Sequence, residues 1–224
     1  METTSNLKVP PKVWVIAGAA AVLLGIVIGI FAFGGPKATT MHLLRTAGTV
    51  SVYDGEDKVI KPREKLGLYS GYNVETEPVS YAWIDLDEVK LVKMDEASEI
   101  EIQKDGKKLE LLVNSGSLFF NVSEPLAGDE IMNICTSTMV VGIRGTCGWV
   151  VSEGDKGAQV YILEGKVEVE AVNTEETAAV SAGEMAQVSV TEEGETEITV
   201  QPFAEEYIAP FVLSELEEED SLSA

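Results

Sequence analysis

The sequence predicts a mainly β domain, built as an antiparallel β-roll, β-solenoid or β-sandwich, with a single transmembrane helix before it. Between residues 46 and 202, apolar and polar residues alternate, as in "YAWIDLDEVKLVKM" and "ASEIEIQKDGKKLELLV". This alternation is typical of half-buried antiparallel strands. Turn dipeptides such as Asp54-Gly55 and Asp105-Gly106 separate the alternating segments. A long uncharged segment near the N-terminus predicts the helix.

That uncharged segment is residues 13–33, which follow a short polar tail, residues 1–12. A helix of this length, at ~1.5 Å per residue, spans the ~30 Å hydrocarbon core of a bilayer. A cleaved signal peptide is the alternative, although its apolar region is usually only about 7–15 residues long. We expect a single-pass anchor in a bacterial cell membrane. Residues 1–12 are then cytoplasmic and the β domain is extracytoplasmic, since long domains are translocated largely regardless of charge.

One face of the predicted anchor carries small residues at every fourth position, namely Ala17, Ala21, Gly25 and Gly29. Small residues at this spacing let two helix backbones approach closely, which favours a homodimer formed through the anchor. The alternative is that glycine and alanine are simply common in membrane helices.

Residues 34–45 are predicted to be a linker and residues 46–202 the β domain. Within the domain a short pattern recurs, in which a glycine and one spacer residue precede an apolar residue that opens a strand. The pattern occurs at Gly48, Gly116, Gly165 and Gly183. A glycine there can adopt the positive φ that a tight turn needs, so the recurrence indicates stacked, similar turns.

The last segment, residues 203–224, is an acidic tail with an apolar patch that includes Tyr207, Phe211 and Val212. We expect this patch to pack back on the domain. The alternative is a peptide that docks to a partner.

The charge and composition exclude several classes of function. The formal net charge is −22, and such a surface repels phosphate backbones, so we expect no nucleic-acid partner. His42 is the only histidine, and no phosphate-binding glycine loop occurs, which argues against an enzyme. The carboxylates of Asp85 and Asp87 fit a solvated strand face as well as a calcium site. We expect no catalytic, cofactor-binding or metal-binding residues.

The two cysteines, Cys135 and Cys147, are candidates for a disulfide in an oxidising compartment. Their spacing requires the chain to turn between them, and Gly142 and Gly145 are available for that corner. Two buried thiols are the alternative. A redox-active pair is not expected, since the spacing is not C-x-x-C.

Four stretches together resemble the FecR domain family. They are "VNSGSLFFNV" (113–122), "NICTSTMVVGIRGTCGWVV" (133–151), "VYILEGKVEVEA" (160–171) and "VSAGEMAQV" (180–188). With the strands before them, the resemblance covers about residues 46–190. It implies a non-enzymatic, mostly β, extracytoplasmic module. It also implies that the motif of Gly142, Arg144, Gly145 and Thr146 is a structural corner, with Arg144 on the face opposite to Ile143, Gly145, Cys147 and Trp149.

The best-known FecR proteins relay an outside signal to a cytoplasmic sigma factor, which they hold with a cytoplasmic segment of several tens of residues. The 12 residues before the predicted anchor are too short for such a segment. We therefore expect a sensory or regulatory module that acts through a protein partner in the membrane or envelope. The alternative is an envelope scaffold or adhesion module that the anchor only tethers.

Overall fold

The computed structural model describes residues 40–223. The predicted anchor, with its face of Ala17, Ala21, Gly25 and Gly29, lies outside the described residues. Within residues 40–223, no helix has the length and apolar character needed to cross a membrane.

The fold is mainly β, as predicted, and its strands alternate between buried and exposed residues. The seventeen strands are β1 (His42–Ala47), β2 (Val50–Tyr53), β3 (Val59–Ile60), β4 (Leu66–Gly67), β5 (Tyr72–Thr76), β6 (Tyr81–Asp85), β7 (Lys90–Met94), β8 (Glu99–Asp105), β9 (Lys108–Val122), β10 (Ile131–Cys135), β11 (Met139–Ile143), β12 (Cys147–Ser152), β13 (Gly157–Glu164), β14 (Lys166–Ala171), β15 (Thr177–Ser181), β16 (Glu184–Val190) and β17 (Thr196–Pro202). The helical elements are η1 (Gly154–Lys156), η2 (Glu205–Tyr207) and α2 (Pro210–Ser223).

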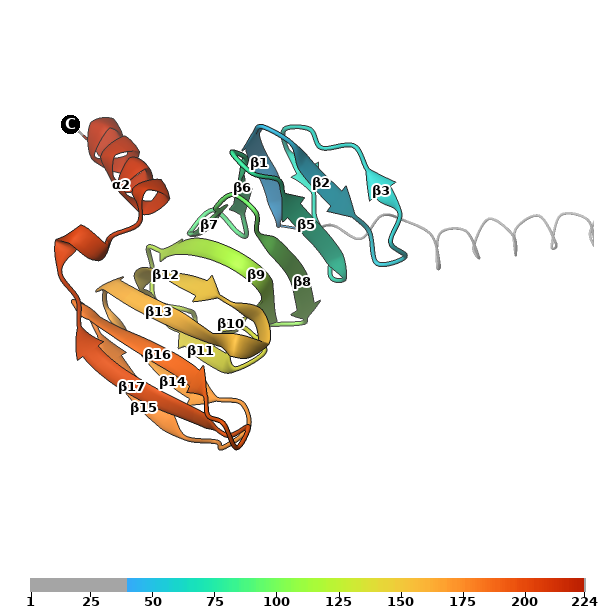
Figure 1. The fold of residues 1–224 in the computed structure, drawn as a ribbon. Coiled ribbons are helices and arrows are strands. Elements are labelled where there is room, and N and C mark those ends of the chain that lie inside the picture. Colours follow the sequence, from blue (N-terminus) through green and yellow to red (C-terminus); the bar gives the residue numbers. More distant parts are fainter. Residues whose placement is uncertain (1–39, 224) are drawn as a thin grey trace, which may run out of the picture. The chain divides into compact units, whose positions relative to one another are not determined.

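The strands form two sheets that share β9. Sheet A has the order β4-β1-β6-β7-β9-β12-β13-β16-β17. Sheet B has the order β3-β2-β5-β8-β9-β10-β11-β14-β15. Every pair is antiparallel except β9 and β10, which are parallel. Figure 1 shows β1 to β8 on one side of β9 and β10 to β17 on the other.

Strand β9 belongs to both sheets because it bends near its middle. Its first half pairs with β8 and β10 in sheet B, and its second half pairs with β7 and β12 in sheet A. The bend lies at Gly116, whose φ is +84°. A side chain on this residue would collide with Ser98, because an added Cβ would lie 2.6 Å from the Ser98 Cα.

The inner faces of the two sheets enclose one hydrophobic core. Strand β14 illustrates how the sequence builds it, since Val167 and Val169 are buried while Glu168 and Glu170 point to solvent. Each fully buried aliphatic side chain of this kind stabilises the fold by roughly 1.5–3 kcal/mol. The period-two alternation therefore fixes which face of each strand belongs to the core.

The chain crosses between the sheets at glycines, and the predicted glycine repeat marks these crossings. Gly48, Gly116, Gly165 and Gly183 have φ values of +75°, +84°, +82° and +82°. The crossings stack on one another through hydroxyl groups. The backbone N–H of Thr49 donates to Ser80 Oγ at 2.9 Å, and that of Ser117 donates to Ser98 Oγ at 2.9 Å. The recurrence thus reflects stacked, similar turns.

The first strand begins earlier than the sequence predicted. Strand β1 starts at His42, inside the segment 34–45 that was predicted to be a linker. Leu43 explains the difference, because it is fully buried and pairs with Ile84 of β6. Strand β17 ends at Pro202, where the β domain was predicted to end.

Candidate functional site

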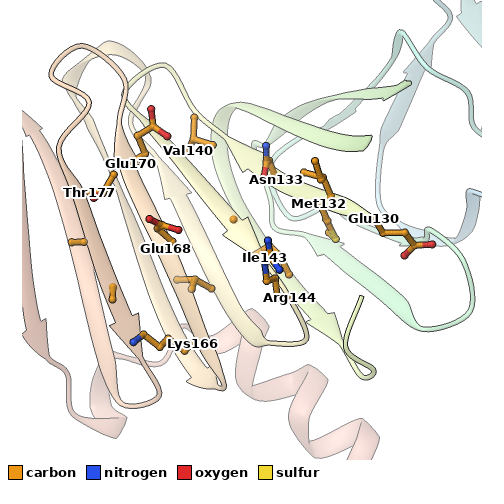
Figure 2. A pocket seen from close by; sticks show the side chains of 15 residues that line it. Glu130, Met132, Asn133, Val140, Ile143, Arg144, Lys166, Glu168, Glu170 and Thr177 are labelled. Carbon is orange, nitrogen blue, oxygen red and sulfur yellow. The ribbon is translucent and has the colours of Figure 1, made fainter. Parts of the chain in front are cut away.

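An open groove of about 700 Å³ lies on the outer face of sheet B (Figure 2). It runs across β10, β11, β14 and β15 and includes the residue just after β11, Arg144. The side chains at its walls are Ile131, Arg144, Lys166, Glu168 and Glu170. The volume lies within the range of about 300–1,000 Å³ that is usual for ligand pockets.

The groove exists because two small residues occupy one cross-strand row. Asn133 of β10 pairs with Gly142 of β11, Gly142 pairs with Glu168 of β14, and Glu168 pairs with Ala179 of β15. Gly142 and Ala179 leave the sheet surface low between their larger neighbours. Gly142 is not strained, and an added Cβ would have only Glu168 O within 4 Å, at 3.8 Å. Gly142 was predicted to form a corner, but it lies inside β11 and forms the groove floor.

Two cations and three carboxylates line the groove. Arg144 and Lys166 line it together with Glu130, Glu168 and Glu170 (Figure 2). Among residues 40–218, whose side chains the structure describes, no carboxylate lies within 4.0 Å of either cation, so neither forms an ion pair there. The Arg144 side chain is exposed to solvent in the described part of the chain. Both cations are therefore available to a partner.

Arg144, Gly145 and Thr146 form the crossing from β11 in sheet B to β12 in sheet A. Gly145 has φ +97°, and an added Cβ would lie 3.1 Å from the Cα of Pro125. Thr146 is buried, and its methyl group packs where a side chain of Gly165 would lie, 2.6 Å from an added Cβ. The motif is thus a corner packed against the next corner of the stack.

This corner reverses the strand phase that the sequence predicted. If one strand continued through residues 143–149, Ile143 would share a face with Cys147 and Trp149, as the sequence predicted. Ile143 instead lies in the core between the sheets, while Cys147 and Trp149 lie on the outer face of sheet A. The positive φ of Gly145 turns the chain between them, so the period-two pattern does not continue through it.

The disulfide predicted between Cys135 and Cys147 is not formed. Cys135 alternates with the core residue Ile134 and therefore faces outward from sheet B, whereas Cys147 faces outward from sheet A. The hydrophobic core separates the two thiols. Burial raises the pKa of the Cys135 thiol to about 11, and the nearby Glu110 carboxylate adds to the shift.

The outer face of sheet A is covered by the C-terminal segment. Phe211 and Val212 of α2 pack with Phe119 and Trp149 in a second apolar cluster. This cluster confirms that the apolar patch in residues 203–224 packs back on the domain. The tail was predicted only as an acidic segment, whereas Pro210–Ser223 forms a helix.

A buried ion pair fixes α2 on sheet A. Lys93 Nζ lies 3.3 Å from Glu215 Oε2, and the two side chains are 4% and 5% exposed. Lys93 also donates to Phe211 O and Ser214 Oγ, both at 2.8 Å, and Trp83 Nε1 donates to Glu215 Oε2 at 2.8 Å. Both charges therefore have hydrogen-bond partners, which a buried pair requires. Sequence reasoning missed this pair. The alternation gave no signal for it, because Lys93 lies between the core residues Val92 and Met94, in the phase expected to face solvent.

The other clustered carboxylates serve the turns. Asp85 Oδ1 accepts hydrogen bonds from the backbone N–H groups of Asp87 and Glu88, at 3.1 and 2.7 Å, and Asp87 pairs with Lys90. Among the described residues, no three His, Cys, Asp or Glu side chains are grouped as a metal site would require.

Part of the chain matches a known protein family. A family model described as "FecR protein" matches residues 72–168, from the start of β5 into β14. The chain carries a FecR domain. The resemblance predicted from the sequence is thereby confirmed over these residues. The FecR match spans β9, the glycine crossings at Gly116, Gly145 and Gly165, and most of the groove.

Two crystal structures from Parabacteroides distasonis ATCC 8503, each of a proposed anti-sigma factor, resemble part of this chain. Both are 18% identical to this chain, with TM-scores of 0.50 and 0.49. In each, the match covers 58% of this chain and 59% of the solved chain. At this identity the likeness concerns the fold. No match is found among curated proteins.

Proposed function

We propose that this chain is a non-enzymatic regulatory module of a bacterial cell membrane, which acts through a protein partner. Residues 13–33 anchor it, residues 1–12 are cytoplasmic, and the FecR domain is extracytoplasmic. The FecR match over residues 72–168 carries the proposal. The fold it shares with a proposed anti-sigma factor supports a regulatory role.

The partner binds at the sheet B groove. The two sheets differ in a way that supports this choice, since α2 covers much of the outer face of sheet A, whereas the groove on sheet B is open. Arg144 and Lys166 are exposed there without an ion pair to any described carboxylate. A partner that presents carboxylates to these two cations gains charge-assisted hydrogen bonds, and arginine is enriched at protein interfaces.

The test is photo-cross-linking of the full-length protein in native membranes, with the cross-linker placed at Thr177, an uncharged residue that lines the groove. The same membrane or envelope protein should be captured by the wild type and lost in two variants. Gly142→Gln fills the groove floor without backbone strain, since an added Cβ meets no close neighbour there. Arg144→Glu reverses a wall charge. A transporter or receptor among the captured proteins is the expected result.

Arg63→Glu is the matched control, because Arg63 is also exposed and lies outside the groove. It should leave capture unchanged. Equal capture by all three variants would refute the groove as the partner site. Replacing residues 1–33 with an unrelated anchor separates the two roles, since signalling should require the face of Ala17, Ala21, Gly25 and Gly29. An unchanged cellular response after that replacement would favour an envelope scaffold instead.

A further inference from the structure

A second, smaller hollow lies on the outer face of sheet A, beyond the part that α2 covers. Its volume is about 350 Å³, and it lies over β13, β16 and β17. Phe203 and Tyr207, which follow β17, supply one wall. No side chain that lines the hollow carries a charge, although the whole chain has a formal net charge of −22. The hollow is therefore an uncharged site on a strongly acidic protein.

One wall of the hollow is a rigid group of aromatic rings. Tyr161 stacks on the buried Trp149, with the ring centroids 4.3 Å apart and the planes at 3°. Phe203 meets both rings edge-on, with centroids 5.6 Å from Trp149 and 5.4 Å from Tyr161. Tyr207 adds a ring that is 63% exposed. The stacking holds Tyr161 in place before any ligand arrives, which lowers the entropy cost of binding.

The floor of the hollow carries three glutamines. Gln159 and Gln187 are directly paired across β13 and β16, and Gln201 lies opposite Met185 on β17. Gln159 accepts a hydrogen bond from Tyr161 Oη at 2.7 Å, and Gln201 donates to Met185 Sδ at 3.6 Å. Gln187 is exposed and forms no side-chain hydrogen bond with any other residue in the part of the chain described. Gln187 thus offers both donors and its acceptor to a ligand, Gln159 keeps both donors and one acceptor position, and Gln201 keeps one donor and its acceptor.

We propose that this hollow binds a neutral saccharide. The negative faces of the tyrosine rings attract the slightly positive C–H groups of a sugar ring. The glutamine amides can donate to and accept from sugar hydroxyls at the same time. Anionic glycans are disfavoured, because the lining offers no cation and the net charge repels them. An uncharged peptide is less well matched, because Gln159 and Gln187 project from β13 and β16, which are paired on both sides and offer no free backbone groups.

The test is calorimetric titration of the full-length protein in a detergent without a sugar headgroup. The probes are tetramers of N-acetylglucosamine, β-linked glucose and α-linked glucose, with tetragalacturonate and an uncharged octapeptide beside them. At least one neutral tetrasaccharide should bind. Gln187→Ala and Tyr207→Ala should each weaken it roughly five- to tenfold, the factor expected for one hydrogen bond or one ring contact. Both residues are exposed, so the fold should tolerate these changes.

Gln103→Ala is the matched control, because Gln103 is an exposed glutamine on β8 of sheet B. It should leave saccharide affinity unchanged, and so should Gly142→Gln, which alters only the groove on the opposite face. The proposal is overturned if no neutral tetrasaccharide binds, or if the anionic tetramer or the peptide binds as tightly. It is also overturned if the Gln187 and Tyr207 variants bind like the wild type. None of these results bears on the partner groove of sheet B.

Discussion

Replacing Lys93 with methionine should release helix α2 from sheet A while leaving the β domain folded. In the wild type Lys93 neutralises the buried Glu215 and donates to Phe211 O and Ser214 Oγ. Removing one partner of a buried ion pair costs about 3–5 kcal/mol, because the remaining charge stays desolvated. This cost decides between local opening of the helix and unfolding of the whole domain.

The apolar contacts of α2 with sheet A oppose the release of the helix. Phe211 and Val212 are 6% and 0% exposed, and burying each stabilises the docked helix by roughly 1.5–3 kcal/mol. The two residues together therefore contribute about as much as the unpaired Glu215 would cost. Undocking rehydrates the carboxylate at once, whereas global unfolding would also expose the core between the sheets. Local opening is the cheaper response.

Amide hydrogen exchange measures this directly. In Lys93→Met, exchange in residues 210–218 should accelerate roughly a hundredfold or more, which corresponds to about 3 kcal/mol. Exchange in β9 should not change. The double variant Lys93→Met/Glu215→Leu should restore slow exchange, because two apolar residues can replace a buried pair at little cost. Lys58→Met, at an exposed position, is the control. If Lys93→Met exchanges like the wild type, or the double variant exchanges like the single, the ion pair does not hold the helix.

Four further predictions concern two corners and a thiol. Gly145→Val should destabilise the domain by roughly 2–3 kcal/mol in urea unfolding, because the residue has φ +97° and lies against Pro125; an unchanged midpoint would contradict this. Gly165→Ala should lower the melting temperature, because its Cβ would lie 2.6 Å from Thr146 Cγ2; an unaltered melting temperature would argue against stacked corners. Cys135→Ala should cost under about 1 kcal/mol, since no disulfide is lost. The Cys135 thiol should alkylate slowly at pH 7 and faster only as the pH rises from 9.0 towards about 11, because the thiolate is the reactive form and burial raises the pKa; rapid alkylation at pH 7 would contradict that environment.

The sequence predicted the strands because their burial is a local property. The alternation of apolar and polar residues shows directly which face of a strand is buried, as for Val167 and Val169 of β14. The glycine repeat marked the crossings for the same reason, since a positive φ is a requirement of one residue and its neighbours. The predicted alternation of faces through the corner at Gly145 was wrong. The positive φ of Gly145 turns the chain there, so Ile143 lies in the core while Cys147 lies on the outer face of sheet A.

The candidate sites depended on contacts that no local pattern contains. The groove of sheet B arises only when the register of four strands puts Gly142 and Ala179 in one row. The Lys93–Glu215 pair joins β7 to the last helix, so neither residue signals the other in the sequence. The disulfide prediction failed for the same reason, because spacing alone did not show that the core lies between Cys135 and Cys147.

Because β9 lies at the centre of both sheets, neither sheet can be completed until β9 has emerged. As the chain emerges from its N-terminus onwards, β7 and β8 appear before β9, and each then presents an unpaired edge that only β9 will cover. Unpaired edges are templates for aggregation. The emerging chain is therefore most exposed to aggregation after residue 105 has appeared and before residue 122 has appeared. Pairing of β9 then covers the open edges of both sheets at once.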